Sequence, residues 1–244
     1  MGIQNRIIRY SSLKSGKVSE YFGHLLIEIF LVMIGILLAL QVSNWNEDRV
    51  NDDKEQKMIH DLREEFSMNK DRILMKQQTR EKVANRLQIY IASISKGTSN
   101  YDDFMAFHGQ EYFVGFTNPS LGVIEALVSS GQLVLITNDT LKYLLADWKD
   151  QIKNLYENEQ ILWNTTIEYQ RIFHSLMPDP KESWNDITVD EKEKHFSAMK
   201  NTISYRNALT SYSGAQNAVI AECSEIIESL NIIIELLKRE EKNK

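Results

Sequence analysis

Apolar residues form one unbroken run near the start of the chain and, further on, three long stretches with gaps of three and four residues. The run from Tyr21 to Val42 has 22 residues. As a helix it would measure about 33 Å, against a hydrocarbon core of about 30 Å. A cleaved signal peptide would have a shorter apolar region of roughly 7–15 residues and a small-x-small site. Because this run ends Leu40-Gln41-Val42, we predict an uncleaved signal-anchor transmembrane helix over residues 21–42.

The first spaced stretch predicts one long helix that ends near Ser95, before the polar residues 96–100. Eight of its eleven spaced positions are apolar, as expected for a helix with one buried face. Residues 43–57 ahead of it are polar apart from Trp45 and Val50, and they are predicted to form a solvated stalk. The spaced positions are Ile59, Leu62, Phe66, Asn69, Ile73, Lys76, Arg80, Val83, Leu87, Tyr90 and Ile94.

Two later stretches predict two more long helices. One has spaced positions from Leu141 to Leu176, and a segment with two prolines, residues 177–180, ends it. The other, from Tyr205 to Leu237, has nine apolar positions of ten and places Cys223 in a core. The charged tail 238–244 is expected to fray, and the adjacent carboxylates at 240 and 241 to be solvated.

Shorter elements are predicted between and beside these helices. Asn118-Pro119 is typical of a helix start, and that helix would end at Ser130, with Gly131 just beyond it. Residues 133–136 are expected to form a short buried connector, and Thr137 to cap the next helix. Thr188 and Glu191 have the spacing of a capping box.

The predicted fold class is therefore all-α: a single N-terminal transmembrane helix followed by an extramembrane bundle of long heptad-patterned helices. The predicted segments are a cytoplasmic segment 1–20, the anchor 21–42, the stalk 43–57 and the bundle domain 58–242. Lys76 or Arg80 is expected to pair with Glu159 in a buried layer that fixes the register of the helices. The alternative is that these polar positions face solvent where the bundle opens.

Polar and small residues within the anchor predict a helix–helix contact. Glu28, Gly35 and Ala39 share a narrow stripe on a helix, and a small-xxx-small pair lets two helices approach closely. The partner would be a second copy of the chain or another membrane protein. The alternative is that Glu28 lies near the membrane edge and reaches toward the headgroups. Tyr21 and Trp45 flank the run as interfacial anchors to the lipid bilayer.

Basic residues predict the orientation of the anchor. Arg6, Arg9, Lys14 and Lys17 precede the span, whereas Arg49, Lys54 and Lys57 follow it. This bias favours a cytoplasmic N-terminus. The expected location is the bacterial inner membrane, single-pass, with the C-terminal domain in the periplasm.

Composition and motifs argue against several classes of function. The net charge of −6 argues against nucleic-acid binding. One cysteine and five histidines without ligand spacing predict no metal site. The chain has no P-loop, no Gly-x-Gly-x-x-Gly and no Gly-x-Ser-x-Gly. We therefore predict no cofactor and no enzymatic activity.

One aromatic segment, residues 101–116, shows no clear helical period and is a candidate ligand pocket. The alternative is that these rings fill one end of the bundle. The candidate lining residues are Tyr101, Phe104, Phe107, His108, Tyr112 and Phe116.

Two segments resemble a family of single-pass membrane proteins of unknown function that is common in Bacteroidota. One is "SSGQLVLITNDTL", residues 129–141, and the other comprises Glu28-Ile29, Leu31-Val32, Ile34-Gly35-Ile36-Leu37, Ala39-Leu40-Gln41 and Asn44-Trp45-Asn46-Glu47. The resemblance implies a membrane anchor followed by a helical domain, and it implies no activity.

The sequence thus favours a non-enzymatic, membrane-anchored helical protein that acts through protein contacts in the cell envelope and is an oligomer or binds a membrane partner. The alternative is a periplasmic ligand-sensing domain that signals through a partner membrane protein, because about twenty residues inside the cell are too few for an output domain.

Overall fold

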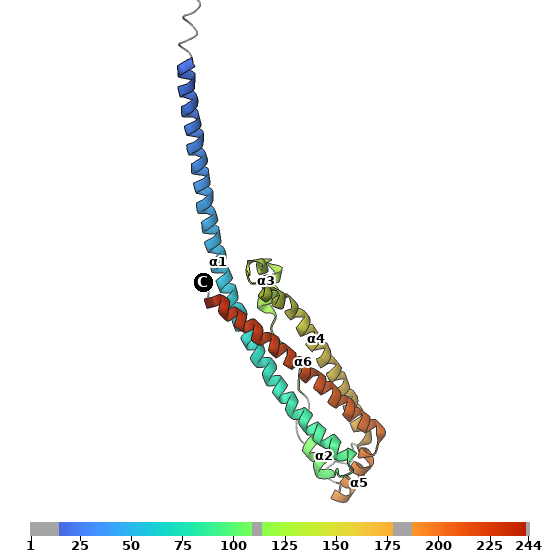
Figure 1. The fold of residues 1–244 in the computed structure, drawn as a ribbon. Coiled ribbons are helices and arrows are strands. Elements are labelled where there is room, and N and C mark those ends of the chain that lie inside the picture. Colours follow the sequence, from blue (N-terminus) through green and yellow to red (C-terminus); the bar gives the residue numbers. More distant parts are fainter. Residues whose placement is uncertain (1–14, 109–113, 178–186, 243–244) are drawn as a thin grey trace, which may run out of the picture. The chain divides into compact units, whose positions relative to one another are not determined.

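A computed structural model describes residues 15–108, 114–177 and 187–242 of the chain. Within these ranges every regular element is helical, so the all-α prediction is confirmed (Figure 1). The elements are α1 (Ser15–Ser95), α2 (Tyr101–His108), α3 (Gly122–Ser129), the 3-10 helix η1 (Gln132–Leu135), α4 (Asp139–Leu176), α5 (Val189–Lys200) and α6 (Ile203–Lys242). The chain divides into two units, residues 1–56 and 57–244, and α1 contributes to both.

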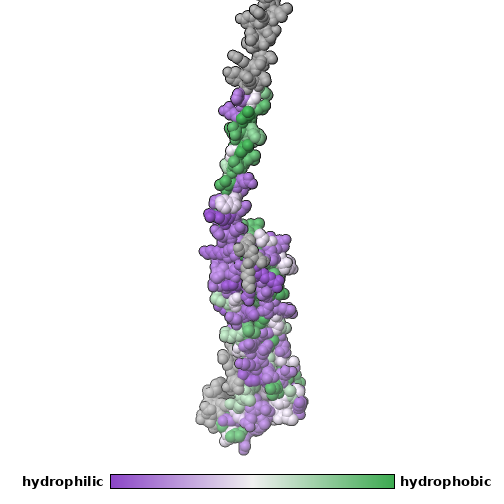
Figure 2. Space-filling view, turned by 60° about the vertical axis from the view of Figure 1, so that its left-hand side comes forward, coloured by the Kyte–Doolittle hydropathy of each residue, from purple (hydrophilic) through white to green (hydrophobic). Residues whose placement is uncertain are grey.

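The first unit contains a strongly apolar part of α1. One helix among the described residues is long and apolar enough to cross a membrane, and its most apolar window has a mean hydropathy of 2.7. The large apolar side chains from Phe22 to Val42 are exposed to solvent in this unit. Figure 2 shows them as a green surface on α1. So much exposed apolar surface is what a segment surrounded by lipid requires.

The second unit is built on three long helices, α1 from Lys57 onward, α4 and α6 (Figure 1). Contacts between α1 and α4 advance in the same direction on both helices, because Phe66 packs on Trp148 and Arg80 pairs with Glu159. The two helices are therefore parallel. α6 runs against them, since Gln77 binds Ser224 while Tyr90 binds Tyr205, further along α1 but earlier on α6.

The spaced apolar positions face the interior as predicted. All ten positions on α6 are buried, including Cys223 and Gln216. On α1 the polar residues Asn69 and Arg80 are buried, while Lys76 is half-buried and Gln77 is buried in its place. This one-residue shift reflects the drift of a helix with 3.6 residues per turn against a 3.5-residue repeat.

Several local predictions were wrong. α2 is a helix, although its aromatic residues showed no clear period. α3 begins at Gly122 and not after Asn118, because Asn118 has a left-handed backbone with φ 48° and residues 114–121 have no regular structure. The connector 133–136 is largely a 3-10 helix, and its Val134 is 76% exposed.

Helix ends were predicted with mixed success. Gly131 follows α3 with φ 70°, and the capping box of Thr188 and Glu191 is present, so both predictions are confirmed. Asn138 caps α4 in place of Thr137, because its side chain accepts a hydrogen bond from the Leu141 amide.

The C-terminal end of α6 differs from the predicted frayed tail. Glu241 pairs with Arg63 and His60 of α1, and Glu240 accepts a 2.8 Å hydrogen bond from the side chain of Asn138, which caps α4. These contacts join the end of α6 to both of the other long helices, and α6 remains helical to Lys242.

The buried thiol of Cys223 provides a test of the packing. Burial raises the pKa of this thiol to about 12 and separates it from solvent. Since the thiolate is the reactive form, we expect iodoacetamide to leave Cys223 unmodified in the folded full-length protein in detergent and to modify it fully in denaturant. Mass spectrometry measures the outcome, and a Val189→Cys variant on exposed α5 should add one rapidly modified thiol. Rapid modification of Cys223 in the folded protein would contradict the packing described here.

Candidate functional site

Because α1 and α4 are parallel, the chain must run back along them between the end of α1 and the start of α4. Residues 114–123, called here the return segment, run along α1 in the reverse direction. Four contacts establish this direction: Arg80 with Gly115, Arg72 with Asn118, Asn69 with Ser120, and Glu65 with Val123. The segment has no helix up to Leu121, so its backbone polar groups need partners from elsewhere.

Side chains of α1 supply several of these partners. The Asn69 amide donates to the Ser120 carbonyl at 2.8 Å and accepts from the Ser120 N–H at 2.7 Å. Glu65 accepts a 2.6 Å hydrogen bond from the N–H of Val123, in the first turn of α3. Both side chains are buried. α1 therefore determines the position of the return segment and the start of α3.

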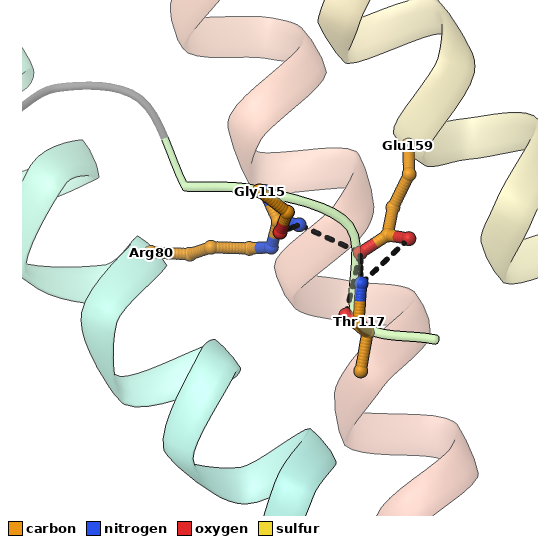
Figure 3. A network of polar contacts seen from close by, with 4 residues as sticks. All are labelled: Arg80, Gly115, Thr117 and Glu159. Carbon is orange, nitrogen blue, oxygen red and sulfur yellow. Dashed lines mark hydrogen bonds and ion pairs between the residues drawn. The ribbon is translucent and has the colours of Figure 1, made fainter. Parts of the chain in front are cut away.

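Arg80 and Glu159 form the centre of the network (Figure 3). Their side chains are 1% and 3% exposed, and Arg80 Nη2 lies 2.6 Å from Glu159 Oε1. The same guanidinium donates to the Gly115 carbonyl at 3.2 Å. Thr117 donates to Glu159 from its N–H, at 3.0 and 3.1 Å from the two carboxylate oxygens, and from its hydroxyl. A buried pair with Glu159 was predicted for Lys76 or Arg80, and the structure forms it with Arg80.

The groups of this network bind one another and thereby position α1, α4 and the return segment. Both oxygens of Glu159 already accept hydrogen bonds from groups of the protein. A buried ion pair gains much less than its Coulomb energy, because both charges lose their hydration. Its greater effect is on specificity: any other alignment of α1 and α4 would leave two charges buried without partners. The network therefore selects one register of the helices.

The candidate pocket residues lie in an aromatic cluster at the other end of the bundle. Phe104 and Phe107 of α2 are buried and His108 is half-buried, with ring contacts to Tyr90 and Phe173. Tyr101 packs on Phe104, and Phe116 packs on Tyr156 of α4 instead. Tyr112 lies outside the described residues. The pocket itself stays a prediction.

His108 is hydrogen-bonded within this cluster. Its Nε2 lies 3.1 Å from the Tyr205 hydroxyl and 3.0 Å from the Tyr169 hydroxyl, and Tyr205 binds Tyr90 at 3.0 Å. Burial lowers the pKa of His108 to about 3, and burial raises the pKa of Tyr90 and Tyr205. The imidazole is therefore neutral and the phenols protonated near pH 7.

The predicted membrane-contact residues Glu28, Gly35 and Ala39 are exposed on α1, and so is the predicted anchor Trp45. A side chain added at Gly35 would meet nothing within 4 Å in this chain. The side chain of Tyr21 lies outside the described part.

Sequence reasoning missed the partners of the polar core residues. Glu65, Thr117 and the Tyr90–Tyr205 pair were not singled out. A signal existed for Thr117, which lies next to Asn118-Pro119, a pair that marks a break in regular structure. Among the described residues, no group of three or more His, Cys, Asp or Glu side chains has the arrangement of a metal site.

A family model described as "Family of unknown function (DUF6090)" matches residues 28–173, more than half of the chain. The chain belongs to the DUF6090 family. In this DUF6090 chain the matched range begins at Glu28 in the apolar part of α1, includes the whole return segment and ends near the end of α4. No curated protein and no solved structure gave a significant match.

Removing one member of the buried pair should destabilise the fold strongly. We expect Arg80→Met to lower the free energy of unfolding by about 3–5 kcal/mol, because it leaves the Glu159 carboxylate buried without its cation. Adding Glu159→Gln should recover part of that loss, since a neutral amide oxygen still accepts from Thr117 without an unpaired charge. Urea unfolding of the full chain in detergent, followed by circular dichroism, measures each value.

Arg171→Met is the matched control for this series. Arg171 pairs with Glu168 three residues away on the same helix, and the two side chains are 72% and 52% exposed. Its loss should cost at most about 1 kcal/mol. If the double variant Arg80→Met/Glu159→Gln were less stable than Arg80→Met alone, the unpaired Glu159 carboxylate would not be the cause of the lost stability.

The buried imidazole predicts a pH dependence of stability. Below about pH 6.5 the unfolded chain takes up a proton at His108, whereas the folded chain does so only near pH 3. Stability is therefore lost as the pH falls from 6.5 toward 3, by up to about 1.4 kcal/mol per pH unit from this group. We expect the Tm of His108→Gln to fall less steeply than that of the wild type between pH 6.5 and 4.5. Parallel Tm curves would contradict this assignment.

Proposed function

We propose that this chain is a single-pass membrane protein whose helical domain acts through protein contacts in the bacterial cell envelope. The observation that carries the proposal is the exposed apolar surface of α1 between Phe22 and Val42, at 36–64% for its large apolar side chains. Water would oppose such exposure, and lipid would favour it. The surface is followed by an α-helical unit with its own buried core.

The proposed location is the inner membrane, with a cytoplasmic N-terminus and a periplasmic helical domain. Arg6, Arg9, Lys14 and Lys17 ahead of the apolar segment support this orientation. Glu28 and the pair Gly35 and Ala39 are proposed to form a contact with another membrane helix, because they are exposed and a small-xxx-small pair lets two helices approach closely.

A role through contacts, without catalysis, is supported by the use of the buried charges. Arg80 and Glu159 bind each other and the return segment. The ligand-sensing alternative would place its pocket at residues 101–116. The described aromatic rings there pack on one another and on Phe173, Phe196 and Tyr169, which favours the contact role.

The anchor is tested in membranes. We expect the full chain to stay in the membrane fraction after an alkaline carbonate wash, and protease added outside intact spheroplasts to remove the domain while sparing a tag on the N-terminus. A matched variant with Leu31→Lys and Ile36→Lys should lose the anchor, because each buried lysine costs about 2.5–3.5 kcal/mol at the centre of a span.

Release of the wild type by carbonate would contradict the anchor, and protection of the domain would reverse the orientation. Crosslinking in these membranes, wild type beside Glu28→Leu, tests the helix contact. A partner or a dimer that is recovered equally from both would assign Glu28 to the membrane edge.

A further inference from the structure

Two adjoining hollows follow one side of α4 in the second unit. One, of about 500 Å³, lies between α3, η1 and α4, with Val128, Leu133 and Ala146 in its lining. The other, of about 360 Å³, lies between the return segment and α4 and extends from Pro119 to Tyr156. Both are lined by Leu121 and Lys149, so together they form one groove along α4, called here the α4 groove.

Apolar side chains line this groove and project beside it. Val128 is 58% exposed and Tyr156 is 53% exposed, and both contribute to its walls. Val134 on η1 is 76% exposed. Exposed apolar side chains gathered at a hollow, with charged residues at its border, are typical of a surface that binds another protein.

The charges of the groove decide which occupant it favours. Glu125 and Lys149 line the larger hollow, and the smaller one adds Asp150, Lys153 and Glu159, whose carboxylate is buried and paired with Arg80. Neither Glu125 nor Lys149 forms an ion pair with another described side chain. Apart from Glu159, whose charge Arg80 neutralises, the groove has two acidic and two basic residues, so it favours neither an anionic nor a cationic ligand. A two-fold axis that passes between Glu125 and Lys149 would place acid against base twice, so this charge pattern suits a second copy of the same surface.

We propose that the α4 groove is the contact between two copies of this chain, related by a two-fold axis, with Glu125 of each copy opposite Lys149 of the other. The proposal rests on the proposed membrane anchor in one respect. Anchors in one bilayer give both copies the same orientation, so the axis lies along the membrane normal. Confinement to the bilayer also raises the effective concentration of one domain at the other.

The experiment uses the full chain in its membranes with a bismaleimide crosslinker. Cys223 is buried, so the unmodified chain should give no crosslinked dimer. Val128→Cys should give a dimer on denaturing gels, whereas Val189→Cys on α5, which is 72% exposed and outside the groove, should give at most one tenth as much. Protection of Cys223 in each variant reports that the domain is folded.

Charge reversal identifies the partner. In the Val128→Cys background, Lys149→Glu alone and Glu125→Lys alone should each reduce the dimer at least five-fold, because like charges then meet across the axis. The two reversals together should restore it, because each acid again faces a base. A crosslink to a different protein would not be restored by the double reversal, because the charges of that protein are unchanged.

Three results would overturn the proposal: equal crosslinking from Val128→Cys and Val189→Cys, reversals without effect, or a double reversal that fails to restore the dimer. A crosslink only to a different protein, identified by mass spectrometry, would also overturn it and would assign the groove to that partner. Carbonate washing of the same membranes separates these failures from failure of the anchor. A chain that stays in the membrane but forms no dimer leaves the proposed function standing.

Discussion

The parallel direction of α1 and α4 is the constraint on which the rest of the domain depends. Two parallel helices joined by the chain need a connection that returns along them, and here that connection is the return segment, residues 114–123. Its backbone groups lack the partners that a helix would provide, so side chains must bind them. Asn69 and Arg80 of α1 and Glu159 of α4 do so. Polar residues at core positions are thus a consequence of the topology.

This network also determines what the surface presents. A shift of α4 along α1 by one heptad would preserve apolar contacts between the helices, but it would separate Arg80 from Glu159 within the core. The same contacts hold the return segment, and Glu65 binds the first turn of α3. Since α3 and α4 form the walls of the α4 groove, the position of that groove follows from the buried polar contacts.

The proposed role through protein contacts agrees with where the buried charges and the exposed apolar residues lie. The buried charges of Arg80 and Glu159 bind each other and the return segment. The exposed apolar residues include the large side chains of α1 between Phe22 and Val42 and, at the α4 groove, Val128 and Tyr156. Membership of the DUF6090 family, which is described as of unknown function, adds no activity to this picture. The proposed contacts would involve one surface for a membrane helix and another for a folded domain.

Helical periodicity is local, so the sequence by itself determined the long helices, their buried faces, the apolar segment of α1 and the capping box at Thr188. Polar residues at core positions also indicated that Lys76 or Arg80 pairs with Glu159, and the tertiary structure selected Arg80, 79 residues away. Only the tertiary structure decided that α3 begins at Gly122, that residues 101–108 are helical and that Thr117 and Ser120 bind Glu159 and Asn69. A backbone group finds a side chain 42 or 51 residues away only once the helices are packed, and no local pattern records that packing.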